Sequence, residues 1–315
     1  MKENTNITNS SVSFLQSGAW EELQRRLGRK TIRCQTPGLS GFGILVNARF
    51  GNHYAYFPHG PSGVWSAENI NEFVEKTREA AGDAKPFFLR VEPFVKDSEE
   101  LSDTLKRAGF IKARANQPEE TFIIDLTKHK EEILSGTEHD TRYSIRAAEK
   151  RGVVIEKTEG NSRADKFEIF WKMFEKTNER HNLSSYGKEY YRRVFFLDGD
   201  ASSKTFFAYL DGEPIACATT VFFGNQAAYL YAASMDGFGK YNAPTLLIWN
   251  ALLDAKENGC VSFDLWGVSS TNKKWSGVTA FKKGFGGRSV RRAGTWDIIF
   301  NNIKYQTYLL AKKIL

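Results

Sequence analysis

Residues 205–233 read TFFAYLDGEPIACATTVFFGNQAAYLYAA, and this stretch decides the fold. It contains three apolar runs that are rich in β-branched and aromatic residues, as strands are. The runs are 205–210, 213–223 and 226–233. Asp211-Gly212 and Gly224-Asn225 separate the runs, and such pairs are typical of tight hairpin turns. The stretch therefore predicts a three-stranded antiparallel meander.

Helices and strands are expected to alternate on both sides of this meander. The predicted helices are 18–26, 67–81, 98–108, 137–150, 163–178, 188–196 and 244–258, and the other predicted strands are 30–34, 43–48, 53–57, 86–91, 121–126, 153–156 and 261–265. Each half of the chain then runs helix, meander, helix, strand, although no residue-level repeat is present. This order resembles the acetyltransferase-like (GNAT) fold in tandem.

We therefore expect an α/β (α+β) protein with two tandem acetyltransferase-like domains. The boundary is placed near Gly152, where a helix ends. The first domain is then 12–152 together with 298–315, a strand and amphipathic helix that we expect to pack back on it, and the second is 153–297. Residues 1–11 are polar and rich in Asn, Ser and Thr, which predicts a disordered tail.

The composition limits the classes of protein that the chain can belong to. Of 315 residues, 41% are hydrophobic and 26% charged, and the formal net charge is +7, which suits RNA, anionic lipid or phosphorylated partners. The N-terminus lacks the apolar core of a signal peptide, and no apolar run reaches the ~20 residues of a membrane span. Three scattered cysteines favour a reducing compartment. We expect a cytoplasmic protein, with peripheral contact at the inner membrane face left open.

Several large enzyme classes find no support in the sequence. The five histidines lack ligand spacing, so we expect no metal, and no GxSxG, P-loop or GxGxxG motif occurs. The loop Gly237–Lys240 precedes a helix, as a pyrophosphate loop for coenzyme A would. It matches that loop poorly, and Pro244 has no amide to offer. No cofactor is therefore expected.

The segment 263–292 is the richest in candidate chemistry. Phe281 and glycines flank Lys282, and a lysine held in this way could stabilise the oxyanion of an acyl-transfer intermediate. A solvated lysine beside a core phenylalanine is the alternative interpretation.

Five segments together resemble the Fem family (FemABX-like) of non-ribosomal peptidyltransferases, which build peptidoglycan cross-bridges from aminoacyl-tRNA. They are Gln117-Pro118 before 121–126, TRYSIRAAEKRGV at 141–153, Glu179-Arg180-His181, Tyr231–Ser234, and Phe281-Lys282 with its glycine-rich tail. The resemblance runs from Phe14 to Leu315. It implies a tandem acetyltransferase-like fold and transfer of an amino acid to the stem peptide of a muropeptide precursor.

The resemblance also implies roles for individual residues. Lys282 matches the lysine that stabilises the intermediate, and Phe281 is the aromatic residue beside it. Glu92 stands where members carry an acid proposed to deprotonate the acceptor amine. The residues expected to bind the acceptor are Tyr231, Tyr190, Tyr186, Phe87 and Trp20.

Two phosphate contacts of members that use UDP-linked precursors are missing here. No lysine closely follows Trp20, and Tyr186 stands in place of an arginine. The helical hairpin of some members is also absent. These departures count against a UDP-linked acceptor and favour a lipid-linked precursor or a non-standard acceptor.

Basic residues provide candidate contacts to tRNA phosphates. They are Arg142, Arg146, Lys150, Lys273, Lys274, Lys283 and Arg288. We expect an aminoacyl-tRNA donor, no DNA partner and a monomer. Two other functions stay open: a coenzyme A-dependent N-acyltransferase on the same fold, and a non-catalytic protein that binds RNA or cell-wall precursors.

Overall fold

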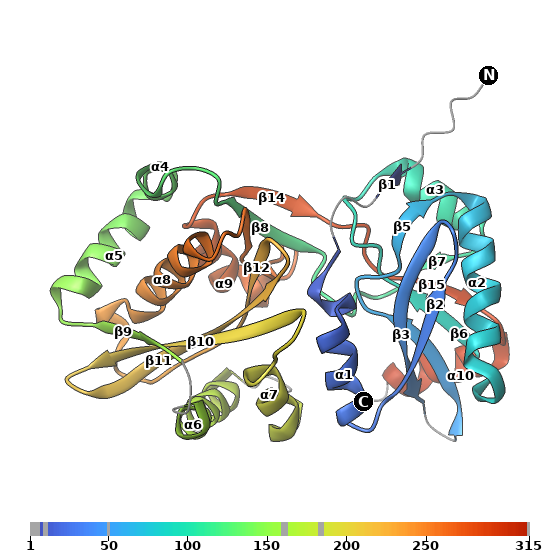
Figure 1. The fold of residues 1–315 in the computed structure, drawn as a ribbon, viewed down its shortest axis with the longest axis horizontal. Helices are drawn as coiled ribbons and strands as arrows, with labels where there is room; N and C mark the ends of the chain where they lie inside the picture. The colour runs from blue at the N-terminus through green and yellow to red at the C-terminus, as the bar shows by residue number, and fades with distance from the viewer. Residues whose placement is uncertain (1–6, 9–11, 49–50, 159–162, 182–185, 314–315) are drawn as a thin grey trace. The chain divides into compact units, whose positions relative to one another are not determined.

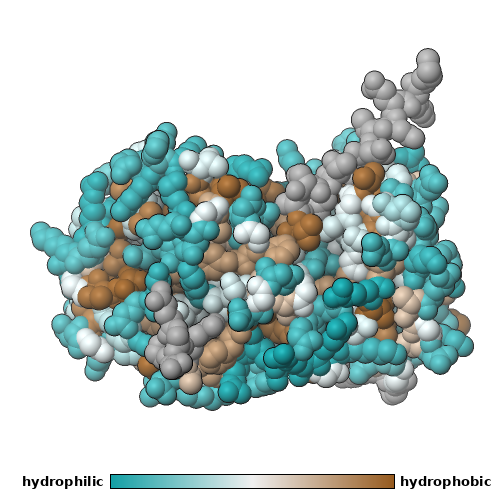
Figure 2. Space-filling view, in the orientation of Figure 1, coloured by the Kyte–Doolittle hydropathy of each residue, from teal (hydrophilic) through white to brown (hydrophobic). Residues whose placement is uncertain are grey.

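The computed structural model describes residues 7–8, 12–48, 51–158, 163–181 and 186–313. The chain divides into two compact units, one made of Met1–Glu119 with Arg291–Leu315 and the other of Glu120–Val290. Each unit is built on its own β-sheet (Figure 1). Hydrophilic residues cover most of the visible surface, with hydrophobic residues showing between them (Figure 2).

The sheet of the first unit has the strand order β1-β5-β3-β4-β6-β15-β7, and β2 pairs with β3 beside this path. Its strands are β1 (Ile7–Thr8), β2 (Lys30–Gln35), β3 (Leu39–Asn47), β4 (His53–Phe57), β5 (Ser62–Trp65), β6 (Phe88–Val91), β7 (Ile111–Lys112) and β15 (Trp296–Ile299). Its helices are α1 (Gly18–Arg26), α2 (Ala67–Ala81), α3 (Glu99–Arg107) and α10 (Asn302–Lys313).

Helix α2 shows why these residues form this unit. The Ser66 side chain accepts a hydrogen bond from the Asn69 amide and so caps the first turn. Ile70, Phe73 and Val74 repeat at helical spacing and are buried in the core beside the sheet. The apolar period that predicted this helix is therefore also the period of its contact with the sheet.

The sheet of the second unit has the order β14-β8-β13-β12-β11-β10-β9. Its strands are β8 (Glu120–Asp125), β9 (Val154–Lys157), β10 (Ala201–Leu210), β11 (Glu213–Phe223), β12 (Gln226–Ser234), β13 (Ser262–Asp264) and β14 (Arg288–Arg291). Its helices are α4 (Lys130–Ser135), α5 (His139–Lys150), α6 (Arg163–His181), α7 (Lys188–Phe195), α8 (Ala243–Glu257) and α9 (Ser276–Lys283). The predicted meander is confirmed as the antiparallel strands β10, β11 and β12.

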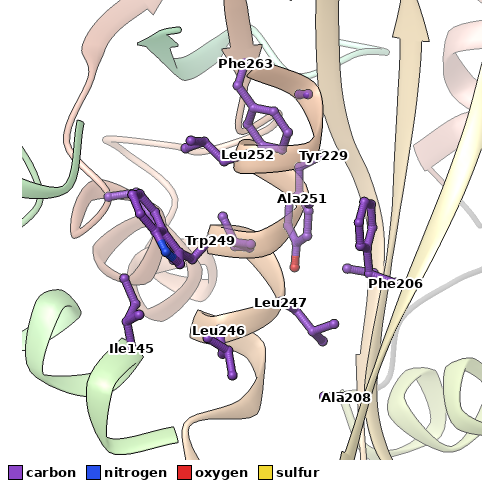
Figure 3. Packing of buried hydrophobic residues seen from close by; sticks show 14 of the residues in the cluster. Ile145, Phe206, Ala208, Tyr229, Leu246, Leu247, Trp249, Ala251, Leu252 and Phe263 are labelled. Carbon is purple, nitrogen blue, oxygen red and sulfur yellow. The ribbon is translucent and has the colours of Figure 1, made fainter. Parts of the chain in front are cut away.

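Helix α8 fills one face of this sheet. Leu247 points toward the strand that carries Phe206, while Trp249 turns toward Ile145 of α5 (Figure 3). Helices α6 and α7 pack on β10, β11 and β12 as well. Phe207, next to Phe206 on β10, points to α6, where Lys166 lies 5.5 Å from the Phe207 ring centre. The sheet is thus covered on both faces.

A β-bulge in β12 decides which side chains reach which face. Thr219 pairs with Tyr231 and Thr220 with Tyr229, so Leu230 is an extra residue. Two residues that are two apart on a regular strand share a face, but the extra residue reverses this relation. Tyr229 therefore joins the core under α8, and Tyr231 lies among the aromatic rings of α6 and α7.

The division of the chain differs from the expected boundary at Gly152. β8 pairs with β13, and Ile133, Ile145 and Ala148 are buried in the core of the second unit. Residues 120–152 therefore belong with the second sheet, because their apolar side chains complete its core. The chain returns to the first unit at Arg291, and not at the expected residue 298. From residue 296 onward β15 pairs with β6 and β7.

The expectation of a disordered N-terminal tail is wrong at two residues. Ile7 and Thr8 form β1, which pairs with Trp65 and Val64 of β5. The other residues of that prediction, 1–6 and 9–11, lie outside the described residues.

Candidate active site

Lys282 is held inside the second unit. It lies near the end of α9, and only 7% of the residue is exposed. Its Nζ atom donates to the carbonyl oxygens of Gly267 at 2.9 Å and Trp266 at 3.3 Å, and it lies 5.5 Å from the ring centre of Tyr229. The predicted lysine is therefore a buried cation surrounded by oxygen dipoles and an aromatic face.

Burial dominates the electrostatics of this lysine. Desolvation lowers the pKa of Lys282 to about 8, and the nearby carboxylate of Asp264 opposes the shift. A lysine with a pKa near 8 is still largely an ammonium at neutral pH. Its ammonium group loses a proton far more readily than that of a surface lysine.

The turn that follows β13 is shaped to present these carbonyl groups. Trp266 has a positive φ of 57°, and its amide donates to the Asp264 carboxylate at 2.7 Å. The Thr121 hydroxyl also donates to that carboxylate. Asp264 therefore fixes the turn, and the turn directs two carbonyl oxygens at Lys282.

Phe281 serves as packing beside the lysine. It is partly buried, packs against the core of the second unit, and meets Phe285 edge to face at a centroid distance of 5.6 Å. The glycines that follow are required by space, because a Cβ atom on Gly286 would lie 2.4 Å from the Gly136 oxygen. One on Gly287 would lie 2.7 Å from the Ile123 oxygen, and both glycines have positive φ.

Three predicted acceptor-binding tyrosines come together. The hydroxyl groups of Tyr190 and Tyr231 are 3.1 Å apart, and the rings of Tyr186 and Tyr190 have centroids 4.3 Å apart. Burial and the neighbouring tyrosines raise the pKa of Tyr231 well above its ordinary value. We call Tyr186, Tyr190 and Tyr231 the tyrosine cluster. Because Tyr186 is 53% exposed, the cluster has one end in solvent and one buried end.

The other two predicted acceptor-binding residues lie in the first unit, and both are buried there. Trp20 packs edge to face on Phe14 at a centroid distance of 5.2 Å. Phe87 lies among aromatic rings that include Tyr54 and also lines a groove of about 300 Å³ beside α10. Trp20 and Phe87 thus have clear packing roles, and binding by them stays a prediction.

Glu92 is the centre of a hydrogen-bond network. Its carboxylate accepts from the Tyr56 hydroxyl at 2.6 Å, the Thr295 hydroxyl at 2.7 Å and the Gln117 amide at 3.0 Å. Burial raises the pKa of Glu92, and these three donors oppose the shift. A raised pKa suits a proton acceptor, and its action as a base stays a prediction.

The predicted phosphate-binding residues differ in their exposure and in their contacts to the rest of the protein. Arg142 is tied to the end of α4, because its guanidinium donates to the carbonyl oxygens of Ser135 and Thr137. Arg288 lines a groove of about 780 Å³ whose other charged residues include Asp125 and Glu132. The remaining residues are exposed in the second unit: Arg146, Lys150, Lys273, Lys274 and Lys283.

The turn before α8 offers few amides to a pyrophosphate. The amides of Tyr241 and Asn242 donate to the carbonyl oxygens of Phe238 and Gly239. Pro244, at the second position of the helix rather than the first, has no N–H group. This geometry agrees with the poor sequence match to a coenzyme A loop.

Two groups of this site were not predicted from the sequence. Tyr229 lies under the lysine because of the bulge, which no sequence pattern indicated. Asp264 ends a strand immediately before Leu265-Trp266-Gly267, and an acid followed by such a turn is a signal that could have been read.

The fold and this site together define a class: an α/β protein of two sheet units with a buried lysine on a short helix of the second. The chain matches the model of the FemAB family over residues 3–213 and 202–313, and it belongs to that family. The predicted resemblance is confirmed.

Relatives agree with this assignment. The UDP-N-acetylmuramoylpentapeptide-lysine N(6)-alanyltransferase of Weissella viridescens is 26% identical over 230 residues, covering 69% of this chain and 67% of that protein. The lipid II:glycine glycyltransferase of Staphylococcus aureus is 21% identical over 319 residues, covering 76% and 75%.

Solved structures share the fold. The crystal structure of FemX superposes with a TM-score of 0.82 at 20% identity, covering 95% of each chain. A tandem GNAT protein from the clavulanic acid biosynthesis pathway gives a TM-score of 0.55 at 11% identity, covering 94% of this chain and 98% of that one. The predicted fold class is thereby confirmed.

Proposed function

We propose that this protein is an aminoacyltransferase that moves an amino acid from aminoacyl-tRNA to an amine of a peptidoglycan precursor stem peptide. The observation that carries the proposal is the buried ammonium of Lys282 in a chain that belongs to the FemAB family. The printed names of its relatives, an alanyltransferase and a glycyltransferase that act on such precursors, support the same activity.

The reaction needs a positioned cation and little else. The acceptor amine attacks the ester carbonyl, a C–N bond forms, and negative charge develops on the carbonyl oxygen. The C–O bond to the tRNA ribose then breaks, and the proton from the amine ends on the ribose oxygen. The ester is already activated, so positioning and one cation can supply the catalysis.

Lys282 suits the cationic role because of how its donors are used. An ammonium has three N–H donors, and the described contacts to Trp266 and Gly267 use two of them. The third can point at a developing oxyanion. A cation already desolvated by the protein interacts strongly with such an oxyanion and needs little reorganisation.

The tyrosine cluster is our candidate for the acceptor side of the second unit. Its exposed ring, Tyr186, offers a flat face, and its paired hydroxyls offer hydrogen bonds to a peptide. Glu92 is the candidate proton acceptor on the first unit. The printed names of the relatives include a UDP-linked and a lipid-linked precursor, so both acceptors stay in the proposal, and the missing phosphate contacts near Trp20 and Tyr186 favour the lipid-linked one.

The protein is proposed to act as a monomer without metal or cofactor, in the cytoplasm or at the membrane surface where lipid-linked precursors lie. In the described residues no helix has the length and apolarity that a bilayer crossing requires.

The test is transfer of radiolabelled amino acid from total charged tRNA to UDP-linked and lipid-linked muropeptides. Transfer to either supports the proposal, and the preferred acceptor shows which carrier is used. Absence of transfer to both, with folded protein, would overturn it. Calorimetry with acetyl-CoA is the parallel arm, since tight binding there would favour the coenzyme A alternative.

A further inference from the structure

All charged residues of the segment that carries Lys282 are basic. From Leu265 to Val290 the chain has five basic residues and no aspartate or glutamate. The five are Lys273, Lys274, Lys282, Lys283 and Arg288. In the described part of the chain, none of the exposed lysines among them is in an ion pair. Positive charge on this segment is therefore available to an anionic partner.

An exposed aromatic ring lies among these charges. Lys273–Trp275 form a single 3-10 turn, η6, directly before α9. Trp275 is 37% exposed and Val278, one turn later, 41%, while Lys273 and Lys274 are exposed beside them. We call Lys273, Lys274, Trp275 and Val278 the Trp275 surface. An exposed tryptophan flanked by lysines combines a stacking face with two exposed cations.

The turn that presents this surface is firmly held. The Asn272 side chain accepts from the Lys274 amide at 3.0 Å, and the Trp275 amide donates to the Asn272 carbonyl at 2.9 Å. The Ser269 amide donates to the Thr279 hydroxyl at 3.1 Å, which joins the loop to α9. The Glu120 carboxylate accepts from the amide and hydroxyl of Ser270. Ordering this surface on binding therefore costs little entropy.

The surface and Lys282 lie at opposite ends of one short helix. Trp275 precedes α9 and Lys282 is seven residues later, a separation of roughly 10 Å along the helix axis. Stacked nucleotides rise by about 3.4 Å each, so this distance corresponds to about three of them. A strand that stacks on Trp275 can thus bring its terminal ester close to Lys282.

We infer that the Trp275 surface binds the unpaired 3′ nucleotides of the aminoacyl-tRNA donor. Trp275 stacks on a base, and Lys273 and Lys274 contact the phosphates. The inference rests on the proposed function, because it assigns the donor's single-stranded end to a place beside Lys282. A lipid surface fits less well, since the apolar part consists of two residues and is flanked by charge.

The test compares binding to an uncharged tRNA and to the same tRNA trimmed of its unpaired 3′ nucleotides. Fluorescence anisotropy with Trp275→Ala should show about tenfold weaker binding to intact tRNA and little change for the trimmed one. Trp275→Phe should recover most of the affinity, because it keeps a stacking face. Circular dichroism and thermal unfolding verify that each variant is folded.

Lys273→Ala/Lys274→Ala should weaken binding. The slope of log Kd against log[salt] should fall by the amount that about two phosphate contacts contribute. The matched control is Lys172→Ala/Lys176→Ala, which removes two exposed charges from α6 and should leave the preference for intact tRNA unchanged. If this control weakened binding equally, general charge and not the Trp275 surface would explain it.

Equal affinity for intact and trimmed tRNA, or an unchanged Trp275→Ala, would overturn the inference. Binding to phosphatidylglycerol vesicles that Trp275→Ala abolishes while tRNA binding persists would overturn it in favour of lipid. These measurements need no turnover. If transfer to every muropeptide failed while Trp275-dependent tRNA binding held, the proposed function would fall and the nucleotide site would remain.

Discussion

The Nζ atom of Lys282 lies 2.9 Å from the carbonyl oxygen of Gly267. This contact gives the lysine two functions in one place. It braces the turn after β13 to α9, and it keeps the ammonium in the interior with its charge partly compensated by peptide dipoles. Substitution of Lys282 therefore changes both the chemistry and the local structure, and an experiment has to separate these effects.

Replacing Lys282 with methionine should lower transfer by about a hundredfold or more, because the oxyanion loses its cation. Methionine keeps the aliphatic stem, and circular dichroism should show a folded protein. Single-turnover transfer measures the loss. Lys172→Met, on the exposed side of α6, is the control and should retain the single-turnover rate. Near-normal turnover in Lys282→Met would sink the mechanism.

The pH dependence should reveal the lowered pKa of Lys282. Its ammonium form is lost as pH rises through about 8, so the rate of single-turnover transfer should fall above that pH. The descending limb should disappear in Lys282→Met. Rates are corrected for spontaneous hydrolysis of the ester. A wild-type descending limb that began only above pH 10 would contradict the assignment.

The same shift predicts a stability effect of known sign. Between about pH 8 and the ordinary lysine value of 10.5, the unfolded chain binds a proton at Lys282 that the folded chain does not. Stability from this group therefore rises with pH in that window, and below it the full penalty is present. Relative to Lys282→Met, the free energy of unfolding should increase by about 2 kcal/mol between pH 7 and 9.5. Urea unfolding of both proteins measures it.

Glu92→Gln tests whether the buried carboxylate acts as a base. The amide presents N–H donors to Tyr56 or Thr295, so the free energy of unfolding should fall by about 1–3 kcal/mol. Thr295→Val, which removes one of the same hydrogen bonds, is the structural control. A base role requires transfer by Glu92→Gln to fall far below that of Thr295→Val at equal folded fraction. Equal activities would leave Glu92 with a structural role only.

Tyr231→Phe should act on acceptor binding. It removes the hydroxyl contact with Tyr190 and keeps the packing, so KM for the acceptor should rise about three- to tenfold with kcat little changed. Steady-state kinetics over acceptor concentration measure this. Tyr229→Phe, on the other face of the sheet, keeps the ring under Lys282 and should leave the acceptor KM unaltered.

Asp297→Ala should destabilise the first unit strongly. Asp297 is fully buried, accepts two hydrogen bonds from Arg90 at 2.7 Å and one from Tyr305 at 2.8 Å, and its loss leaves a buried guanidinium unpaired. The cost should be about 3–5 kcal/mol in denaturant unfolding. Glu22→Ala breaks the exposed pair with Arg26 in the same unit and should cost less than about 1 kcal/mol.

The meander was predictable because its turns and apolar runs are local signals. Asp211-Gly212 and Gly224-Asn225 both separate the strands as expected, although β10 begins at Ala201, four residues earlier. The bulge at Leu230 left no such signal, since it depends on how β11 and β12 pair. The faces reached by Tyr229 and Tyr231 could therefore not be assigned beforehand.

The candidate site was predictable in its residue types and not in its partners. Lys282 was found through its flanking aromatic residue and glycines, but nothing in the chain near it indicated that Gly267 would be its partner. Arg142 was placed among phosphate-binding residues by its helical spacing, whereas the structure ties it to the end of α4. The predicted boundary at Gly152 differs from the observed one for a similar reason. Residues 120–152 complete a core whose strands lie far away in the sequence.

The interrupted first unit has a consequence for how this chain is made. Arg90 and its partner Asp297 are 207 positions apart, so the ribosome needs roughly 10 to 40 s after one to deliver the other. The second unit, Glu120–Val290, is continuous and is synthesised within that interval. Until the last strand arrives, β6 has an open edge toward the place that β15 will take, and such an edge invites pairing with other chains. The risk of such pairing is therefore greatest during synthesis. It lasts for the time that the ribosome needs to make the second unit, which is inserted between β7 and β15.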